Sequence, residues 1–178
     1  GRSLDGSEPK YLNSPETEVF EKGKHLFGLD KSSISIRKKD FAVVVEGYFD
    51  VMALYDSGIT NVVASLGTAL SSNQITLLSR CTDSKKIVLN FDTDNAGIRA
   101  ANRAINEVES LAIQGQLDLR VLQLPSGKDP DEFLINHSSA EYEALAINSP
   151  LWMDWQMDQS IKDLDLSKSD QFQKAVSD

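Results

Sequence analysis

The middle of this 178-residue chain alternates short apolar runs with longer segments whose apolar residues recur every three or four positions. The apolar runs are rich in β-branched residues, as is typical of buried strands, and occupy residues 41–45, 61–64, 86–91 and 117–124. The segments between them predict helices at 48–57, at 71–80 and over about 98–112. Strict alternation of strand and helix is typical of a parallel sheet with covering helices. The sequence therefore predicts an α/β fold with about four mainly parallel strands and helices on both faces.

The two flanks of this region differ from it in pattern. Residues 1–40 lack clear periodicity and are rich in turn formers, which predicts a loop-rich lead-in with a short helix over 16–24. Beyond Pro125 the pattern predicts short helices at 131–136 and from Ser138 onward, followed by a helical segment over 150–178. We therefore expect a lead-in at 1–40, an α/β domain at 41–149 and the start of a helical subdomain at 150–178.

Composition narrows the class of protein. The chain carries 27 acidic and 18 basic residues, and 14 of the acidic ones lie in 41–150, so it is not a general nucleic-acid clamp. The single cysteine, Cys81, rules out an internal disulfide and a four-thiolate zinc site, and it suits a reducing compartment. No apolar run approaches the ~20 residues of a membrane span. The chain opens without a Met, and we expect it to be a piece of a longer protein.

Acidic residues follow two of the predicted strands. Glu46 ends the first strand, and Asp92 and Asp94 come directly after the third. Residues two apart in an extended segment point the same way, and ligands of parallel sheets bind at the carboxyl ends of the strands. If the first and third strands are neighbours, the three carboxylates converge, and they then need protons or a cation to balance them. Oxygen ligands without His or Cys favour Mg²⁺ or Mn²⁺.

A second acidic group follows the fourth strand. Asp129 and Asp131 flank Pro130, and Asp50 lies one turn into the first helix, within reach of the same crevice. Together with the first group they could hold more than one ion, an arrangement suited to phosphoryl or nucleotidyl transfer. A lone Asp at a strand end is more often a helix N-cap or a solvated loop charge. Asp94, which precedes Asn95-Ala96-Gly97, fits an N-cap as well as a ligand.

Four segments together resemble the Toprim domain of bacterial-type DNA primases, namely VEGYFDV at 45–51, SLGTAL at 65–70, NFDTDNAG at 90–97 and PSGKDPDE at 125–132. The lead-in at 9–17, with Lys22-Gly23, is similar to the segment just before that domain in the same primases. The resemblance covers Gly1 to about residue 150. It implies a Toprim fold. It also implies a set of metal-binding acids formed by Glu46, Asp92 and Asp94 as catalytic residues, with Asp50, Asp129 and Asp131 completing the site.

The same resemblance implies a basic strip that contacts nucleotide phosphates and template, formed by Arg2, Lys10, Asn13, Lys22 and Lys24. Lys128 is a further phosphate contact or, equally, a solvent-exposed turn lysine. The implied activity is that of a DNA-directed RNA polymerase which makes short RNA primers on single-stranded DNA by Mg²⁺- or Mn²⁺-dependent nucleotidyl transfer, with two or more ions when nucleotide is bound.

Further expectations follow from the resemblance. The partners would be single-stranded DNA, nucleoside triphosphates, the RNA primer and, through a domain outside this chain, a replicative helicase. Zinc would belong to the full-length enzyme only. The place of action would be the bacterial cytoplasm, at the replication fork, with no membrane involved. This chain alone is expected to be weakly active or inactive. The alternatives are another Toprim activity, such as a nuclease or topoisomerase-type cleavage, and a non-catalytic metal- or nucleotide-binding module.

Overall fold

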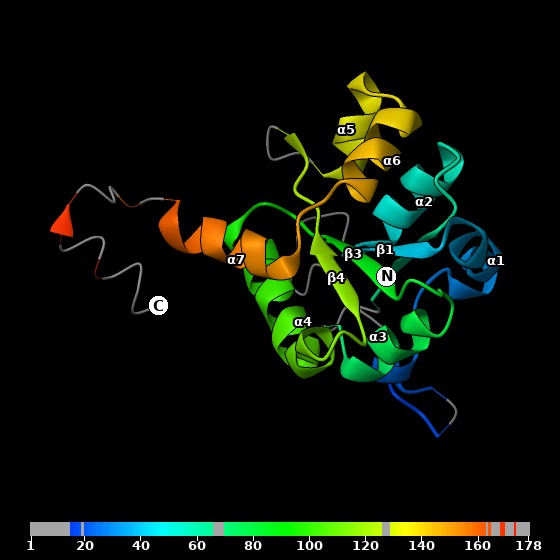
Figure 1. The fold of residues 1–178 in the computed structure, drawn as a ribbon. Coiled ribbons are helices and arrows are strands. Elements are labelled where there is room, and N and C mark those ends of the chain that lie inside the picture. The colour runs from blue at the N-terminus through cyan, green and yellow to red at the C-terminus, as the bar shows by residue number, and fades with distance from the viewer. Residues whose placement is uncertain are drawn as a thin grey trace.

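The computed structural model describes residues 15–18, 20–65, 70–125, 129–162, 164, 168–169 and 173. Its centre is a four-stranded sheet in the order β2-β1-β3-β4, in which every pairing is parallel (Figure 1). The strands are β1 (Phe41–Val45), β2 (Val62–Ala64), β3 (Lys86–Asn90) and β4 (Asp118–Val121). The predicted α/β class, the strand number and the parallel sheet are confirmed, although β4 is shorter than the predicted strand at 117–124.

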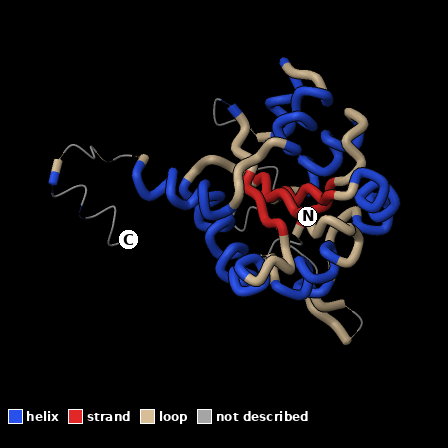
Figure 2. The backbone as a smooth tube through the Cα atoms, in the orientation of Figure 1, coloured by secondary structure: helices blue, strands red, loops and turns tan. Residues whose placement is uncertain are grey.

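Helices connect the strands and flank them, as Figure 2 shows by colour. They are the 3₁₀ helix η1 (Lys22–Lys24) and the α-helices α1 (Leu29–Lys39), α2 (Tyr48–Asp56), α3 (Ser72–Ser79), α4 (Asn95–Ile113), α5 (Pro130–Asn136), α6 (Ser139–Ile147) and α7 (Trp152–Ile161). The helices α3 and α6 each begin with a capping box, formed by Ser71 with Gln74 and by Ser138 with Glu141.

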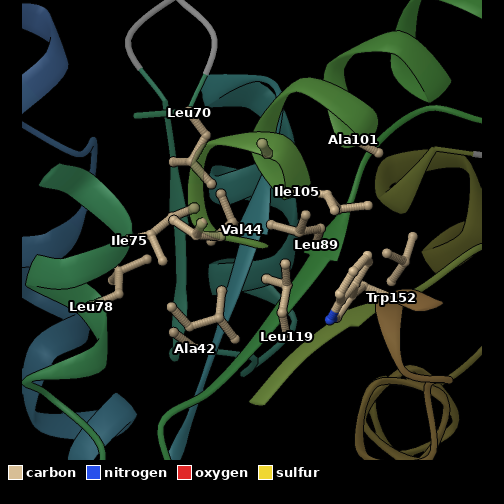
Figure 3. Close-up of a cluster of buried hydrophobic side chains, with 14 of the residues drawn as sticks. Ala42, Val44, Leu70, Ile75, Leu78, Leu89, Ala101, Ile105, Leu119 and Trp152 are labelled. Carbon is tan, nitrogen blue, oxygen red and sulfur yellow. The ribbon is translucent and has the colours of Figure 1, made fainter. Parts of the chain in front are cut away.

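The sheet is covered on both faces, which explains why its central strand β1 is apolar throughout. On one face Ala42 and Val44 of β1 pack in a cluster with residues of α3, α4 and α7 (Figure 3). On the other face Val43 and Val45 pack with residues of α2, α5 and α6. Since successive side chains of a strand alternate between faces, a strand buried on both sides reads as a continuous apolar run. In Figure 1 the sheet accordingly lies between α3 and α4 below and α2, α5 and α6 above.

Both edges of the sheet are met by a single antiparallel bridge. At the β2 edge Phe27 of the lead-in pairs with Ala64, and at the β4 edge Leu151 pairs with Arg120. The lead-in and the chain just before α7 therefore each cover strand-edge groups that would otherwise be open to pairing.

The lead-in differs from the prediction. The expected helix over 16–24 is reduced to η1, and the stretch expected to be loop-rich contains α1, three turns long. Only Ser32 and Ile36 of α1 are buried, and the Ser32 hydroxyl donates to the Val62 carbonyl oxygen (2.7 Å). A helix that faces the sheet edge through a serine and one isoleucine carries little apolar periodicity, so pattern reading missed it.

The two tryptophans of α7 lie in the sheet core. Trp152 and Trp155 are both buried in the cluster that covers the α3 and α4 face. Thus α7 packs on the same core as the strands, while the predicted domain boundaries stay predictions. Over the described part of the chain, no helix has the length and apolar character that a membrane crossing requires.

Candidate acidic active site

The strand order places the predicted acidic residues at the carboxyl end of the sheet, which we call the acidic edge. In the β1–β3 pairing Val45 lies opposite Asn90, so Glu46 leaves β1 beside the point where the Phe91-Asp92 segment leaves β3. The first and third strands are thus neighbours, which is the condition on which convergence of Glu46, Asp92 and Asp94 depended.

Asp50 is folded back toward this edge at the start of α2. Its Oδ2 accepts a hydrogen bond from the Gly47 backbone N–H (3.0 Å), the residue directly after Glu46. A Cβ at position 47 would lie 2.9 Å from that same oxygen, so the glycine leaves room for the carboxylate. Because glycine follows Glu46, the carboxylates of Glu46 and Asp50 can both lie at this end of the sheet.

Asp94 is the N-cap of α4. Its Oδ1 accepts from the backbone N–H groups of Ala96 and Gly97, each at 2.8 Å, so the N-cap alternative for this residue is confirmed. These bonds use one carboxylate oxygen, and the charge of the group still acts on Glu46. Capping therefore leaves Oδ2 for a further ligand.

The first turn of α4 also packs against the backbone of Asp92. A Cβ built at Gly97 would lie 2.0 Å from the Asp92 carbonyl oxygen. Only glycine lets the helix approach this closely, so Gly97 helps to set where the Asp92-Thr93-Asp94 segment lies.

Asp129 plays a similar part at α5. It is the N-cap, its Oδ1 accepts from the Glu132 N–H (2.8 Å), and Pro130 occupies the first helical position. Asp131 is exposed in the first turn. Both charges act on Asp50, so this second acidic group faces the same crevice as the first.

Burial and mutual repulsion raise the pKa values of the carboxyl groups in the crevice. Burial raises the pKa of Glu46 to about 7, with the charges of Asp92, Asp94 and Asp50 adding to the effect. Burial likewise raises the pKa of Asp50 to about 6, against the lowering effect of its Gly47 hydrogen bond. The pKa of Asp92 is raised by burial and then by Asp129 and Asp94. Each of these carboxyl groups therefore takes up a proton more readily than a free one, and a bound cation would favour the ionised forms.

One buried atom at this edge lacks a partner. Within the described residues, Glu46 Oε1 is buried and receives no hydrogen bond. A buried carboxylate oxygen without a donor is costly, and a hard cation would satisfy it. No three His, Cys, Asp or Glu side chains in the described ranges are already gathered closely enough to hold an ion. The donor set thus fits Mg²⁺ or Mn²⁺ in chemistry and charge, and binding would have to draw the carboxylates together.

Only part of the predicted basic strip can be placed. Lys22 and Lys24 lie in η1, and the Lys24 ammonium pairs with Glu21 (2.6 Å) at the surface, which raises the lysine pKa. The remaining residues of that strip, and the separate candidate Lys128, lie outside the described residues; those of the strip are Arg2, Lys10 and Asn13. The segment after η1 approaches the acidic edge, since the Phe27 ring lies 4.8 Å from that of Tyr48, centroid to centroid.

Sequence reasoning missed a buried polar link beneath the crevice. The Tyr142 hydroxyl of α6 donates to Asn90 Oδ1 (2.7 Å), and Asn90 Nδ2 donates to the Leu122 carbonyl oxygen (3.2 Å). Both side chains are buried. This link ties the end of β3, two residues before Asp92, to the segment after β4 and to α6. Its signal in the sequence was an asparagine inside an apolar strand.

Comparison with known proteins gives this geometry a context. A Toprim-like family model matches residues 43–134, which is just over half of the chain and contains the six acidic residues predicted to form the metal site. The chain belongs to the Toprim-like family. A second model, for the N-terminal domain of the DNA primase catalytic core, matches residues 1–33.

Toprim-like relatives with similar sequences are DNA primases. The chain is 64% identical over 99% of its length to the DNA primase of Synechococcus elongatus and 39% identical over its whole length to that of Clostridium acetobutylicum. It spans 25% and 29% of those two proteins, so it corresponds to little more than a quarter of each.

The solved structures with a similar fold include DNA primase domains. A DNA primase domain from Pseudomonas aeruginosa matches with a TM-score of 0.81 and 39% identity, covering 94% of this chain and 52% of that one. A DnaG primase catalytic domain bound to single-stranded DNA matches with a TM-score of 0.80 and 35% identity, covering 99% of this chain and 56% of that one. The Toprim-like fold is thus that of the DnaG-type primases, as the sequence motifs predicted.

Proposed function

We propose that the protein to which this Toprim-like chain belongs is a nucleotidyltransferase that makes short RNA primers on single-stranded DNA. The observation that carries the proposal is that Glu46 and Asp92 leave two neighbouring parallel strands side by side, with the charge of Asp92 acting on both Glu46 and Asp50, in a chain whose relatives are DNA primases. A crevice that repels its own charges is suited to hold cations, and cations are what bring two phosphate-bearing substrates together.

The acidic residues have distinct parts in this proposal. Glu46, Asp92 and Asp94 would hold the ions directly, and Asp50, Asp129 and Asp131 would complete the site. When bound, Mg²⁺ or Mn²⁺, as two or more ions with nucleotide, would make the primer hydroxyl more acidic and offset charge on the triphosphate. The protein then has to hold its carboxylates ionised and oriented. Because burial raises the pKa of Glu46 to about 7, ion binding near neutral pH would release the proton from whatever fraction of this side chain still carries one.

The partners follow from the same reading. Lys22 and Lys24, with Arg2, Lys10 and Asn13, would contact the triphosphate and the template, and Lys128 would contact phosphate. Single-stranded DNA as template is supported by the relative whose catalytic domain is described as bound to it. Nucleoside triphosphates, the RNA primer, a replicative helicase and a place in the bacterial cytoplasm complete the proposal. Zinc would be held elsewhere in the full-length enzyme.

The experiment is primer synthesis by the full-length primase that carries this chain, with the substitution Asp92→Asn. We expect RNA synthesis to fall at least ~10³-fold, because a neutral amide cannot replace a charged ion ligand, while the melting temperature changes little. Asp158→Asn makes the same chemical change on the exposed face of α7 and should leave synthesis unchanged. Near-wild-type synthesis by Asp92→Asn would show that the site assignment is wrong.

A further inference from the structure

A buried glutamine joins the lead-in to the Toprim-like unit. Gln74, in the first turn of α3, is fully buried. Its Oε1 accepts from the Ser71 N–H (2.9 Å), as a capping box requires. Its Nε2 donates to two carbonyl oxygens of the lead-in, those of Lys22 (2.9 Å) and His25 (2.5 Å). The amide of this one side chain therefore holds the start of α3 and both ends of η1.

The 3₁₀ helix η1 is held mainly by polar contacts, which include a further bond from the Lys22 N–H to Glu16 Oε1 (3.1 Å). None of its residues is buried. A second bond from α3 reaches its middle, where the Ser71 hydroxyl donates to the Gly23 carbonyl oxygen (2.6 Å). A turn without apolar burial is positioned by its polar contacts, and here those contacts come mainly from the N-terminal end of α3.

The segment held in this way leads to the acidic edge of the sheet. Three residues after η1, Phe27 pairs with Ala64 through two backbone hydrogen bonds (2.8 and 3.1 Å). Ala64 lies opposite Val45, the residue before Glu46. The Phe27 ring also lies against Tyr48, the first residue of α2. Displacement of η1 would therefore move its lysines relative to the carboxylates.

From these contacts we infer that Gln74 is a positioning residue, which holds the basic turn Lys22–Lys24 in place for the phosphates of nucleotide or template. This inference rests on the proposed function, because it assigns η1 the role of a phosphate contact. It adds a residue of the Toprim-like unit that touches neither metal nor substrate, yet sets the affinity of the site for its anionic substrate.

The substitution Gln74→Glu separates this role from capping. A glutamate at this position still accepts the Ser71 N–H, so α3 keeps its capping box. It loses both N–H donors and instead sets a carboxylate oxygen against the carbonyl oxygens of Lys22 and His25. The control is Glu141→Gln, which makes the reverse exchange at the same position of the exposed α6 capping box, away from the lead-in.

The first measurement is hydrogen exchange of the 178-residue chain. In Gln74→Glu we expect the amides of residues 22–27 to exchange at least about ten-fold faster, a factor that corresponds to ~1.4 kcal/mol of local stability. The amides of α3 should keep the exchange rates of the unsubstituted chain. Glu141→Gln should leave residues 22–27 unchanged. Unchanged exchange of residues 22–27 in Gln74→Glu would overturn the inference.

The second measurement is steady-state primer synthesis by the full-length primase with Gln74→Glu, together with Mn²⁺ titration. We expect the KM for nucleoside triphosphate to rise about ten-fold while kcat and Mn²⁺ affinity stay within about two-fold, since only binding of the anionic substrate is weakened. Faster exchange with an unchanged KM would show that the glutamine is merely structural and would overturn the inference, with the proposed function intact. Absence of primer synthesis by the unsubstituted enzyme would overturn both.

Discussion

At the scale of single residues, Asp94 combines two roles that its two oxygens keep apart. Oδ1 caps α4, and the charge of the carboxylate acts on Glu46. Asparagine can cap a helix as well as aspartate, whereas alanine cannot. We therefore expect Asp94→Asn to change the free energy of unfolding by less than ~0.5 kcal/mol and Asp94→Ala to lower it by about 1 kcal/mol.

Both substitutions of Asp94 should weaken Mn²⁺ binding, because both remove the charge. Urea unfolding and calorimetric titration of the two variants measure the two roles separately. If Asp94→Asn binds Mn²⁺ as tightly as the unsubstituted chain, then Asp94 is only a cap.

Glu46 gives the metal-free chain a characteristic pH dependence. Its folded pKa of about 7 lies above the ordinary value of 4.5, so the folded chain keeps a proton that the unfolded chain has released. Stability from this group is present below about pH 4.5 and is lost as the pH rises through 7. The substitution Glu46→Gln removes this pH-dependent loss of stability, because glutamine does not ionise. At pH 7.5 without metal, we expect the variant to be about 1 kcal/mol more stable than the unsubstituted chain, after allowance for solvent screening.

The comparison is urea unfolding with EDTA at pH 5.0 and 7.5. The difference between variant and unsubstituted chain should grow from the lower to the higher pH. Glu107→Gln, on the exposed side of α4, should show no such growth. A difference that is constant with pH would contradict the burial of the Glu46 carboxyl.

At the scale of elements, strands buried on both faces were predictable because they are apolar runs in the sequence. The helices between them were predictable from their apolar periodicity or from capping pairs at their start. The helix α1 did not, because its inward side is a serine bonded to the Val62 carbonyl and a single isoleucine. The order of the strands in the sheet could not be predicted either, because the pairing of β1 with β3 joins segments that are far apart in the sequence. The approach of Glu46 to Asp92 depended on that pairing. Glu46 and Asp92 were predictable as site residues because they come just after β1 and β3.

The polar links between elements were beyond sequence reasoning for a different reason. Asn90 and Tyr142 are 52 residues apart, and so only the fold brings them together. A buried hydrogen bond that loses one partner leaves the other unsatisfied. We expect Tyr142→Phe to lower the free energy of unfolding by about 1–2 kcal/mol. The double variant Asn90→Leu with Tyr142→Phe should recover part of that loss.

A double-mutant cycle by urea unfolding measures the coupling of this pair. We expect an interaction energy of at least ~0.5 kcal/mol, as for side chains in direct contact. Additive effects of the two substitutions would mean that α6 is held to β3 by packing alone.

At the scale of the whole molecule, acidic charge is concentrated where the chain has its chemistry. Residues 41–150 carry 14 acidic and 7 basic residues, and six of the acidic ones are at the carboxyl end of the sheet or in the adjoining first turns of helices. The lead-in, with 8 basic and 7 acidic residues, joins that end through Phe27 and Gln74. A fold that joins a segment carrying basic residues to the end of the sheet where the carboxylates lie is suited to anionic substrates that bind together with a metal ion.

The most direct test is a calorimetric titration of Mn²⁺ into the 178-residue chain at pH 7.5, in parallel with Asp92→Asn and Glu46→Gln and in the presence of a nucleoside triphosphate. We predict saturable binding by the unsubstituted chain, weakened at least about ten-fold in each variant, since each removes a charged oxygen ligand. Equal affinity in all three proteins, or no Mn²⁺ binding by the unsubstituted chain, would contradict the assignment of the acidic crevice as a metal site.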